Sequence, residues 1–129
     1  MSGQRSRAVA VLATVAIVIG ILTFFAARGE PFTQAGGVRL WRLVHMNMFG
    51  AILTLIGGTM GAVAARRHSR GLVLATGGLF MIVALATLVT IGSAANFTGG
   101  RGDTFAFWLA MGIGPLALAL TPDPGEGAP

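Results

Sequence analysis

The stretch AVAVLATVAIVIGILTFFAA, residues 8–27, carries no charged side chain and only two polar ones, Thr14 and Thr23. A helix of about 20 apolar residues is as long as the hydrocarbon core of a bilayer is thick. The apolar part of a secretory signal peptide is shorter, at about 7–15 residues. The stretch therefore predicts a retained membrane-spanning helix over residues 8–27.

Three more apolar runs follow, separated by segments rich in Gly, Pro or Arg. They cover residues 40–65, 71–95 and 104–120. Short connections make consecutive helices antiparallel neighbours. The predicted fold class is all-α: one domain, residues 1–129, forming a four-helix transmembrane bundle with up-down topology. The Pro- and Gly-rich end, residues 121–129, is expected to be a disordered tail.

The composition agrees with a lipid environment. Hydrophobic residues make up 54% of the chain and charged residues 10%, whereas soluble domains average about 25% charged residues. All nine basic residues are Arg, and Ala and Gly are abundant, a usage typical of high-GC bacterial genomes. The absence of Cys excludes disulfides, thiolate metal sites and cysteine nucleophiles.

The net charge of +5 does not indicate nucleic-acid binding, because the Arg residues flank the apolar runs and there act as topology signals. Five of them fall on one side of the predicted membrane: Arg5, Arg7, Arg66, Arg67 and Arg70. The other side carries Arg28, Arg39, Arg42 and Arg101. The tight loop at 66–70 is the strongest signal. It predicts a multi-pass plasma-membrane protein with both termini in the cytoplasm.

Small residues cluster in the second run. Gly57 and Gly61 are four residues apart, as are Gly58 and Ala62. This spacing places small side chains on one helix face, where a second helix can approach closely. Two interpretations follow: packing inside the bundle, or a face through which the chain forms a homodimer or binds another membrane protein.

His45 is the candidate binding residue, together with Trp41 and Arg42. It is expected about one turn inside the second helix, three residues after Arg42. One interpretation is a packing or interfacial histidine. The other is an anion, headgroup or quinone site near the outer surface. A bis-histidine haem is not predicted, because His68, the second of two histidines, falls in the opposite loop. No cofactor and no metal site are predicted.

No Asp, Glu, Lys or Arg lies at the centre of a predicted span. Proton-coupled transport normally needs such a group, and acid–base catalysis needs paired titratable groups. The sequence therefore predicts no enzyme. It predicts a non-catalytic structural or accessory component of a membrane assembly. The alternatives are a ligand-binding or redox helper using His45 and an oligomeric small channel or transporter.

Two features are shared with a known protein family. The first is the segment His45-Met46-Asn47-Met48-Phe49-Gly50, and the second is the basic loop and Gly-rich run from Arg66 to Gly78. Over residues 8–120 the chain resembles a family of small four-helix actinobacterial membrane proteins of unknown function. The resemblance implies four spans and a basic N-terminus, and no assigned activity. Members often have a second histidine in this region or early in the fourth span, where this chain has Phe107-Trp108-Leu109.

Overall fold

The computed structural model describes residues 2–29, 38–40, 44–93, 96 and 100–122. These residues form four helices and one small hairpin. The helices are α1 (Gly3–Ala26), α2 (Met48–Arg66), α3 (Arg70–Thr90) and α4 (Gly102–Leu120). The strands are β1 (Val38–Leu40) and β2 (Val44–Met46). All four helices are long and apolar enough to cross a membrane. The prediction of an all-α chain with four such helices is confirmed.

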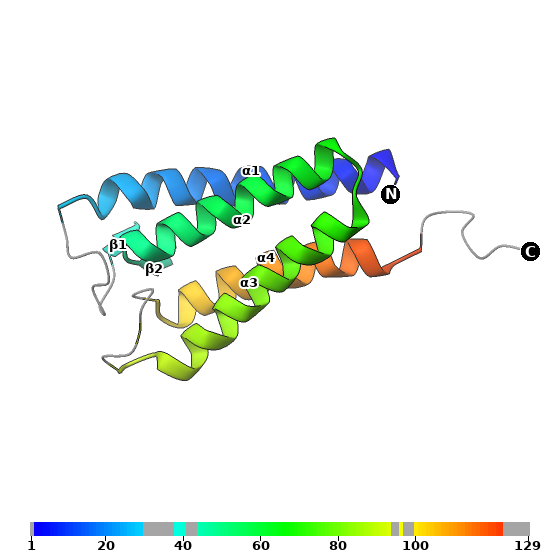
Figure 1. The fold of residues 1–129 in the computed structure, drawn as a ribbon. Coiled ribbons are helices and arrows are strands. Elements are labelled where there is room, and N and C mark those ends of the chain that lie inside the picture. Colours follow the sequence, from blue (N-terminus) through cyan, green and yellow to red (C-terminus); the bar gives the residue numbers. More distant parts are fainter. Residues whose placement is uncertain (1, 30–37, 41–43, 94–95, 97–99, 123–129) are drawn as a thin grey trace, which may run out of the picture.

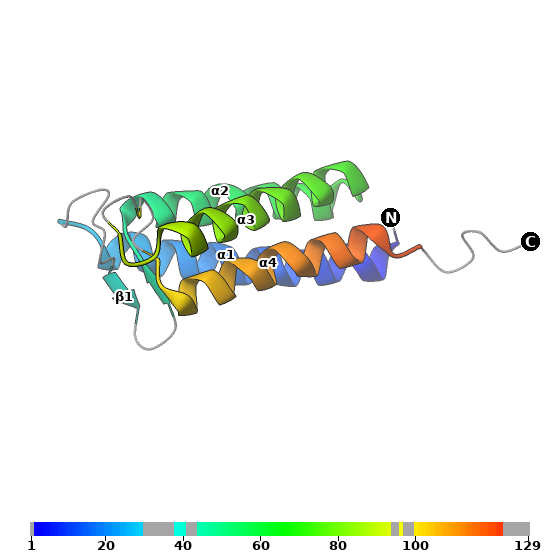
Figure 2. The same ribbon diagram turned by 90° about the horizontal axis from the view of Figure 1, so that it is seen from below.

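The helices run up and down as two hairpins laid side by side. Helix α1 packs along α2 and α3 along α4, with α2 next to α3 (Figure 1). Viewed after a 90° turn, α2 and α3 form one layer and α1 and α4 the other (Figure 2). The start of α1, the α2–α3 connection and the end of α4 share one end of the bundle. The hairpin lies at the opposite end.

Polar caps decide where the helices begin. Ser2, Asn47 and Ser69 each accept a hydrogen bond from the backbone N–H three residues on, at 3.3, 2.9 and 3.3 Å. Before α4 the backbone N–H of Arg101 donates to Thr104 Oγ1 at 3.1 Å. These bonds satisfy N–H groups that have no partner within a helix. At the shared end, the Arg5 guanidinium donates to the carbonyl groups of Thr121 and Pro122, which joins α1 to the end of α4.

The second predicted span is wrong at its start. Helix α2 begins at Met48 rather than near residue 40, because Asn47 is its N-cap. Part of the preceding stretch forms the antiparallel hairpin, in which Val38 pairs with Met46 and Arg39 with His45. A short apolar run rich in β-branched residues suits a strand as well as a helix, and periodicity alone does not separate them.

Two other boundaries also differ from the prediction. Helix α1 starts at Gly3 rather than Ala8, because polar residues at a membrane edge do not interrupt helical hydrogen bonding. Helix α3 ends at Thr90 rather than near residue 95. Ile91 leaves the helical conformation, and Gly92 takes a φ of +79°, which favours glycine. The predicted tail lies outside the described residues from 123 onward.

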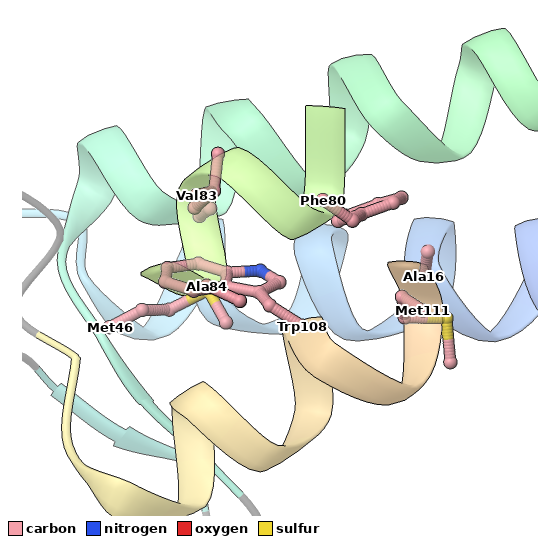
Figure 3. Close-up of a cluster of buried hydrophobic side chains, with 8 residues drawn as sticks. Ala16, Met46, Phe80, Val83, Ala84, Trp108 and Met111 are labelled. Carbon is pink, nitrogen blue, oxygen red and sulfur yellow. The ribbon is translucent and has the colours of Figure 1, made fainter. Parts of the chain in front are cut away.

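The larger of two core clusters lies toward the hairpin end and joins all four helices to β2 (Figure 3). Its buried members are Ala16, Met46, Ala51, Phe80, Val83, Ala84, Trp108 and Met111. The second cluster lies toward the shared end and consists of Val9, Ala64, Ala65, Val73 and Ala119. Its members have small or β-branched side chains.

Candidate functional site

The structure describes only part of the candidate binding site predicted from the sequence, which consists of Trp41, Arg42 and His45. The backbone of His45 lies in β2, opposite Arg39, and not inside a helix. Trp41 and Arg42 lie outside the described residues, as does the side chain of His45. His45 therefore precedes helix α2 rather than lying one turn inside it, because Asn47 caps the helix after His45.

The glycines of α2 face other helices of the same bundle. A Cβ on Gly57 would lie 2.4 Å from Phe80 Cζ of α3. One on Gly58 would lie 2.8 Å from Ile17 Cγ1 of α1, and one on Gly61 would lie 3.1 Å from Ala13 Cβ. Intramolecular partners therefore occupy these positions. Ala62 is half-buried and lines a groove between α1 and α2.

A polar pair lies within the apolar interior. Trp108, fully buried, donates from Nε1 to Thr54 Oγ1 at 3.0 Å. The Thr54 hydroxyl in turn donates to the Gly50 carbonyl oxygen at 2.9 Å and lies 3.6 Å from the Met46 sulfur. Figure 3 shows the indole between Met46 and the α3 residues Val83 and Ala84. The pair ties α4 to α2 and leaves both polar groups satisfied.

The centre of the bundle is closely packed. A cavity of about 10 Å³ lies where all four helices meet, between Ala13, Gly61, Thr76 and Pro115. Its one polar side chain is Thr76, whose hydroxyl donates to the Leu72 carbonyl at 2.8 Å. Such a space is about the size of one water molecule. It offers no room for a cofactor or a permeating solute.

A much larger space opens on the surface between α1 and α2 at the shared end. This α1–α2 groove has a volume of about 400 Å³. Its lining includes Arg7 and Arg66, one from each helix, and His68 of the connection to α3. The small side chains of Ala10 and Ala62 line the part of the groove that lies further from the shared end of the bundle. The groove is therefore cationic at its mouth and apolar along its length.

The mouth is shaped by a left-handed residue. His68 has a φ of +49°. Its N–H donates to the Ala65 carbonyl at 3.3 Å, and the N–H of Ser69 donates to the Ala64 carbonyl at 3.1 Å. This is the Schellman pattern that ends a helix. It turns the chain directly into Ser69, the cap of α3, and brings the imidazole back over α1.

The histidine of the opposite loop is thereby held beside a side-chain partner. Ser6 Oγ lies 2.7 Å from His68 Nδ1. Ser6 is 4% exposed. Sequence reasoning missed this pair, because the two residues are 62 positions apart and neither belongs to a recognisable motif. The αL turn at His68 follows from the tight connection, but its contact with α1 depends on helix packing.

Ser6→Ala should lower the free energy of unfolding by about 1 kcal/mol, since a net intramolecular hydrogen bond is worth roughly 0.5–1.5 kcal/mol. The partner variant is His68→Asn, because Asn tolerates the left-handed conformation. Thermal unfolding of both single variants and the double variant in detergent gives the coupling. Additive effects would show that Ser6 and His68 do not interact.

In the described ranges no group of three or more His, Asp and Glu residues is placed to hold a metal ion. Comparisons of the chain with protein-family models, with curated proteins and with solved structures find no match. The resemblance to the actinobacterial family therefore stays a hypothesis. Function has to be argued from the geometry above.

Proposed function

We propose that this protein is a four-span membrane protein without catalytic activity, and that it serves as a structural or accessory component of a larger membrane assembly. The proposal rests mainly on the close packing of the described residues in the core. Where all four helices meet, the free space is about 10 Å³. The polar side chains Thr54, Thr76 and Trp108 are hydrogen-bonded inside the bundle. Such a protein acts through its outer surface.

The outer surface suits lipid. Large apolar side chains point outward along the helices, and Val89 of α3 reaches 83% exposure. In water such a surface would drive association, but in a bilayer it meets acyl chains. Helix α1 alone exposes Val11, Val15, Val18, Ile21 and Phe25. The Arg-rich shared end supports a cytoplasmic location for both termini, because Arg is enriched in cytoplasmic loops.

One outward face carries several small side chains. On α4, around the 51% exposed Ile113, the exposed positions include Ala106, Ala110 and Ala117. They are spaced four and seven residues apart, so they lie on one face of the helix. Small outward side chains allow the backbone of another membrane helix to approach closely. This face of α4 is where we expect the partner protein to pack, since the glycines of α2 are already occupied.

The test is extraction from the native membrane in mild detergent through a C-terminal tag, with mass spectrometry of everything retained. We expect a defined membrane protein in stoichiometric amount. Ala110→Leu should reduce its recovery several-fold, because the added side chain holds the two helices apart. Ala75→Leu, at an exposed position of α3, is the matched control and should leave recovery unchanged.

Recovery of the chain alone, in a detergent that preserves other assemblies, would contradict the accessory role. The purified chain would then distinguish the alternatives. A stable homo-oligomer that conducts ions in liposomes would make it a channel or transporter. A bound quinone or coloured group lost in His45→Ala would make it a ligand-binding or redox helper.

A further inference from the structure

The α1–α2 groove has the composition of a lipid site. Arg7 on α1 and Arg66 on α2 line its mouth from opposite walls. Both side chains are exposed, and neither guanidinium makes a hydrogen bond or ion pair with the described residues. Among the described residues, no acidic side chain lines the groove. Two guanidinium groups that line one groove from two helices suit a phosphate, which Arg contacts through paired N–H donors.

The walls beyond the mouth are apolar. Ala10 and Ala62 face each other across the groove, and Thr14 follows on α1, about 10 Å further along the helix axis than Arg7. The Thr14 hydroxyl donates to the Ala10 carbonyl at 2.8 Å, which removes its hydrogen from the groove surface. This part of the groove offers space and apolar surface with little for a soluble anion to bond.

A separate hollow of about 340 Å³ lies further along α2, against Ile52, Ile56 and Thr59. Thr59 is three residues before Ala62, so the two positions share a helix face. A ligand whose anionic end binds Arg7 and Arg66 can therefore lay a hydrocarbon chain along Ala62 and onto Ile56.

We propose that the α1–α2 groove binds an anionic glycerophospholipid, with the phosphate held by Arg7 and Arg66 and an acyl chain along Ala10, Ala62 and the outer face of α2. His68, fixed by Ser6, closes the mouth and adds a ring nitrogen near the phosphate. Anionic lipids of the cytoplasmic leaflet lie at the depth of such Arg residues. The proposal rests on the proposed membrane location but not on a protein partner, so failure to recover a partner leaves it intact.

The test compares neighbouring arginines. The full chain is purified, reconstituted with phosphatidylglycerol or phosphatidylcholine, and the lipid retained in detergent is measured by native mass spectrometry. Wild type should retain one phosphatidylglycerol in preference to phosphatidylcholine. Arg66→Gln should weaken that retention by about tenfold, the worth of one charge-assisted hydrogen bond. Arg67→Gln removes the same charge from the adjacent position outside the groove and should retain lipid as wild type does.

A second pair of variants tests shape without changing charge. Ala62→Leu fills the apolar part of the groove and should also release the lipid. Ala75→Leu adds the same side chain on α3 and should have no effect. Equal losses in Arg66→Gln and Arg67→Gln, or full retention in Ala62→Leu, would overturn the proposal. A control with inorganic phosphate distinguishes a lipid from a free anion. If millimolar phosphate raises the melting temperature of the protein as much as phosphatidylglycerol does, the ligand is a free anion and the lipid assignment is wrong.

Discussion

Trp108→Ala is expected to lower the free energy of unfolding by roughly 3–5 kcal/mol, the range measured when large buried aromatics are truncated. Trp108 is fully buried and contributes to the core cluster that all four helices share. In a membrane the lost burial from water counts less, but the cavity and the lost dispersion contacts remain. The loss also removes the donor to Thr54. Unfolding in mixed micelles, followed by circular dichroism, measures the change.

Two variants show which part of the effect is packing. Trp108→Phe keeps an aromatic ring and removes the Nε1 donor, and Thr54 still donates to the Gly50 carbonyl. It should cost about 1 kcal/mol. Phe25→Ala removes an aromatic ring that is 57% exposed and should cost much less than Trp108→Ala. If Trp108→Ala and Phe25→Ala destabilised the protein equally, the core around the indole would not hold the helices together.

Trp108 also illustrates what the sequence cannot show. A tryptophan near the start of a predicted span resembles an interfacial anchor. In the structure it is buried, because its helix turns that side toward α2 and Thr54 supplies an acceptor. A buried tryptophan and an interfacial one can stand at the same position of the same sequence. The rotation of α4 about its axis decides which of the two Trp108 becomes. The apolar residues of the four helices form only a weak periodic pattern, so packing between the helices sets that rotation.

The existence of the four helices followed directly from the apolar runs, and several of their ends did not. Residues 40–46 were predicted as the start of a helix, but Leu40 and residues 44–46 belong to strands. Asn47 was the available signal, since Asn is among the preferred N-cap residues. At the other end of the bundle, Arg5 and Arg7 belong to α1 although they interrupt the apolar pattern. Hydropathy measures affinity for lipid, whereas capping determines where helical hydrogen bonds stop.

The candidate site was predicted around His45, at the hairpin end of the bundle, whereas the α1–α2 groove opens at the shared end. His45 attracted attention because it was expected within a span, and His68 was set aside as a loop residue. The structure gives His68 a 2.7 Å contact with Ser6 and a place in a large groove. Contacts between residues distant in sequence leave no periodic signal. The small-residue spacing from Gly57 to Ala62 was visible, but its partners on α1 and α3 were not.

Gly77→Val is expected to destabilise the bundle by about 1–3 kcal/mol or more, because overpacking is costly where neighbours cannot move. A Cβ on Gly77 would lie 2.7 Å from Leu116 Cγ and 3.0 Å from the Gly112 carbonyl oxygen of α4. The side chain of Leu116 can rotate, but a backbone carbonyl in a helix cannot. The reciprocal position is equally tight, since a Cβ on Gly112 would lie 3.0 Å from the Met81 backbone nitrogen.

The adjacent residue is a matched control. A Cβ on Gly78 would meet no atom within 4 Å outside its own helix and its chain neighbours. Gly77→Val and Gly78→Val change the helix propensity, the hydrophobicity and the mass of α3 in the same way. Gly78→Val should therefore stay within about 0.5 kcal/mol of wild type, as surface substitutions usually do. The difference in melting temperature between the two variants isolates the approach of α3 to α4.

A second pair of variants, Gly77→Ala alone and together with Leu116→Ala, separates the side-chain clash from the backbone clash. Leu116→Ala removes the flexible neighbour of Gly77, so it should recover part of the stability lost in Gly77→Ala. It should not recover all of it, because the Gly112 carbonyl at 3.0 Å remains. Full recovery would mean that Leu116 alone limits the contact and that the two backbones can separate without loss. Partial recovery would mean that the close approach of Gly77 to Gly112 holds α3 and α4 together, and that glycine is required on both sides because only its lack of a Cβ permits that distance.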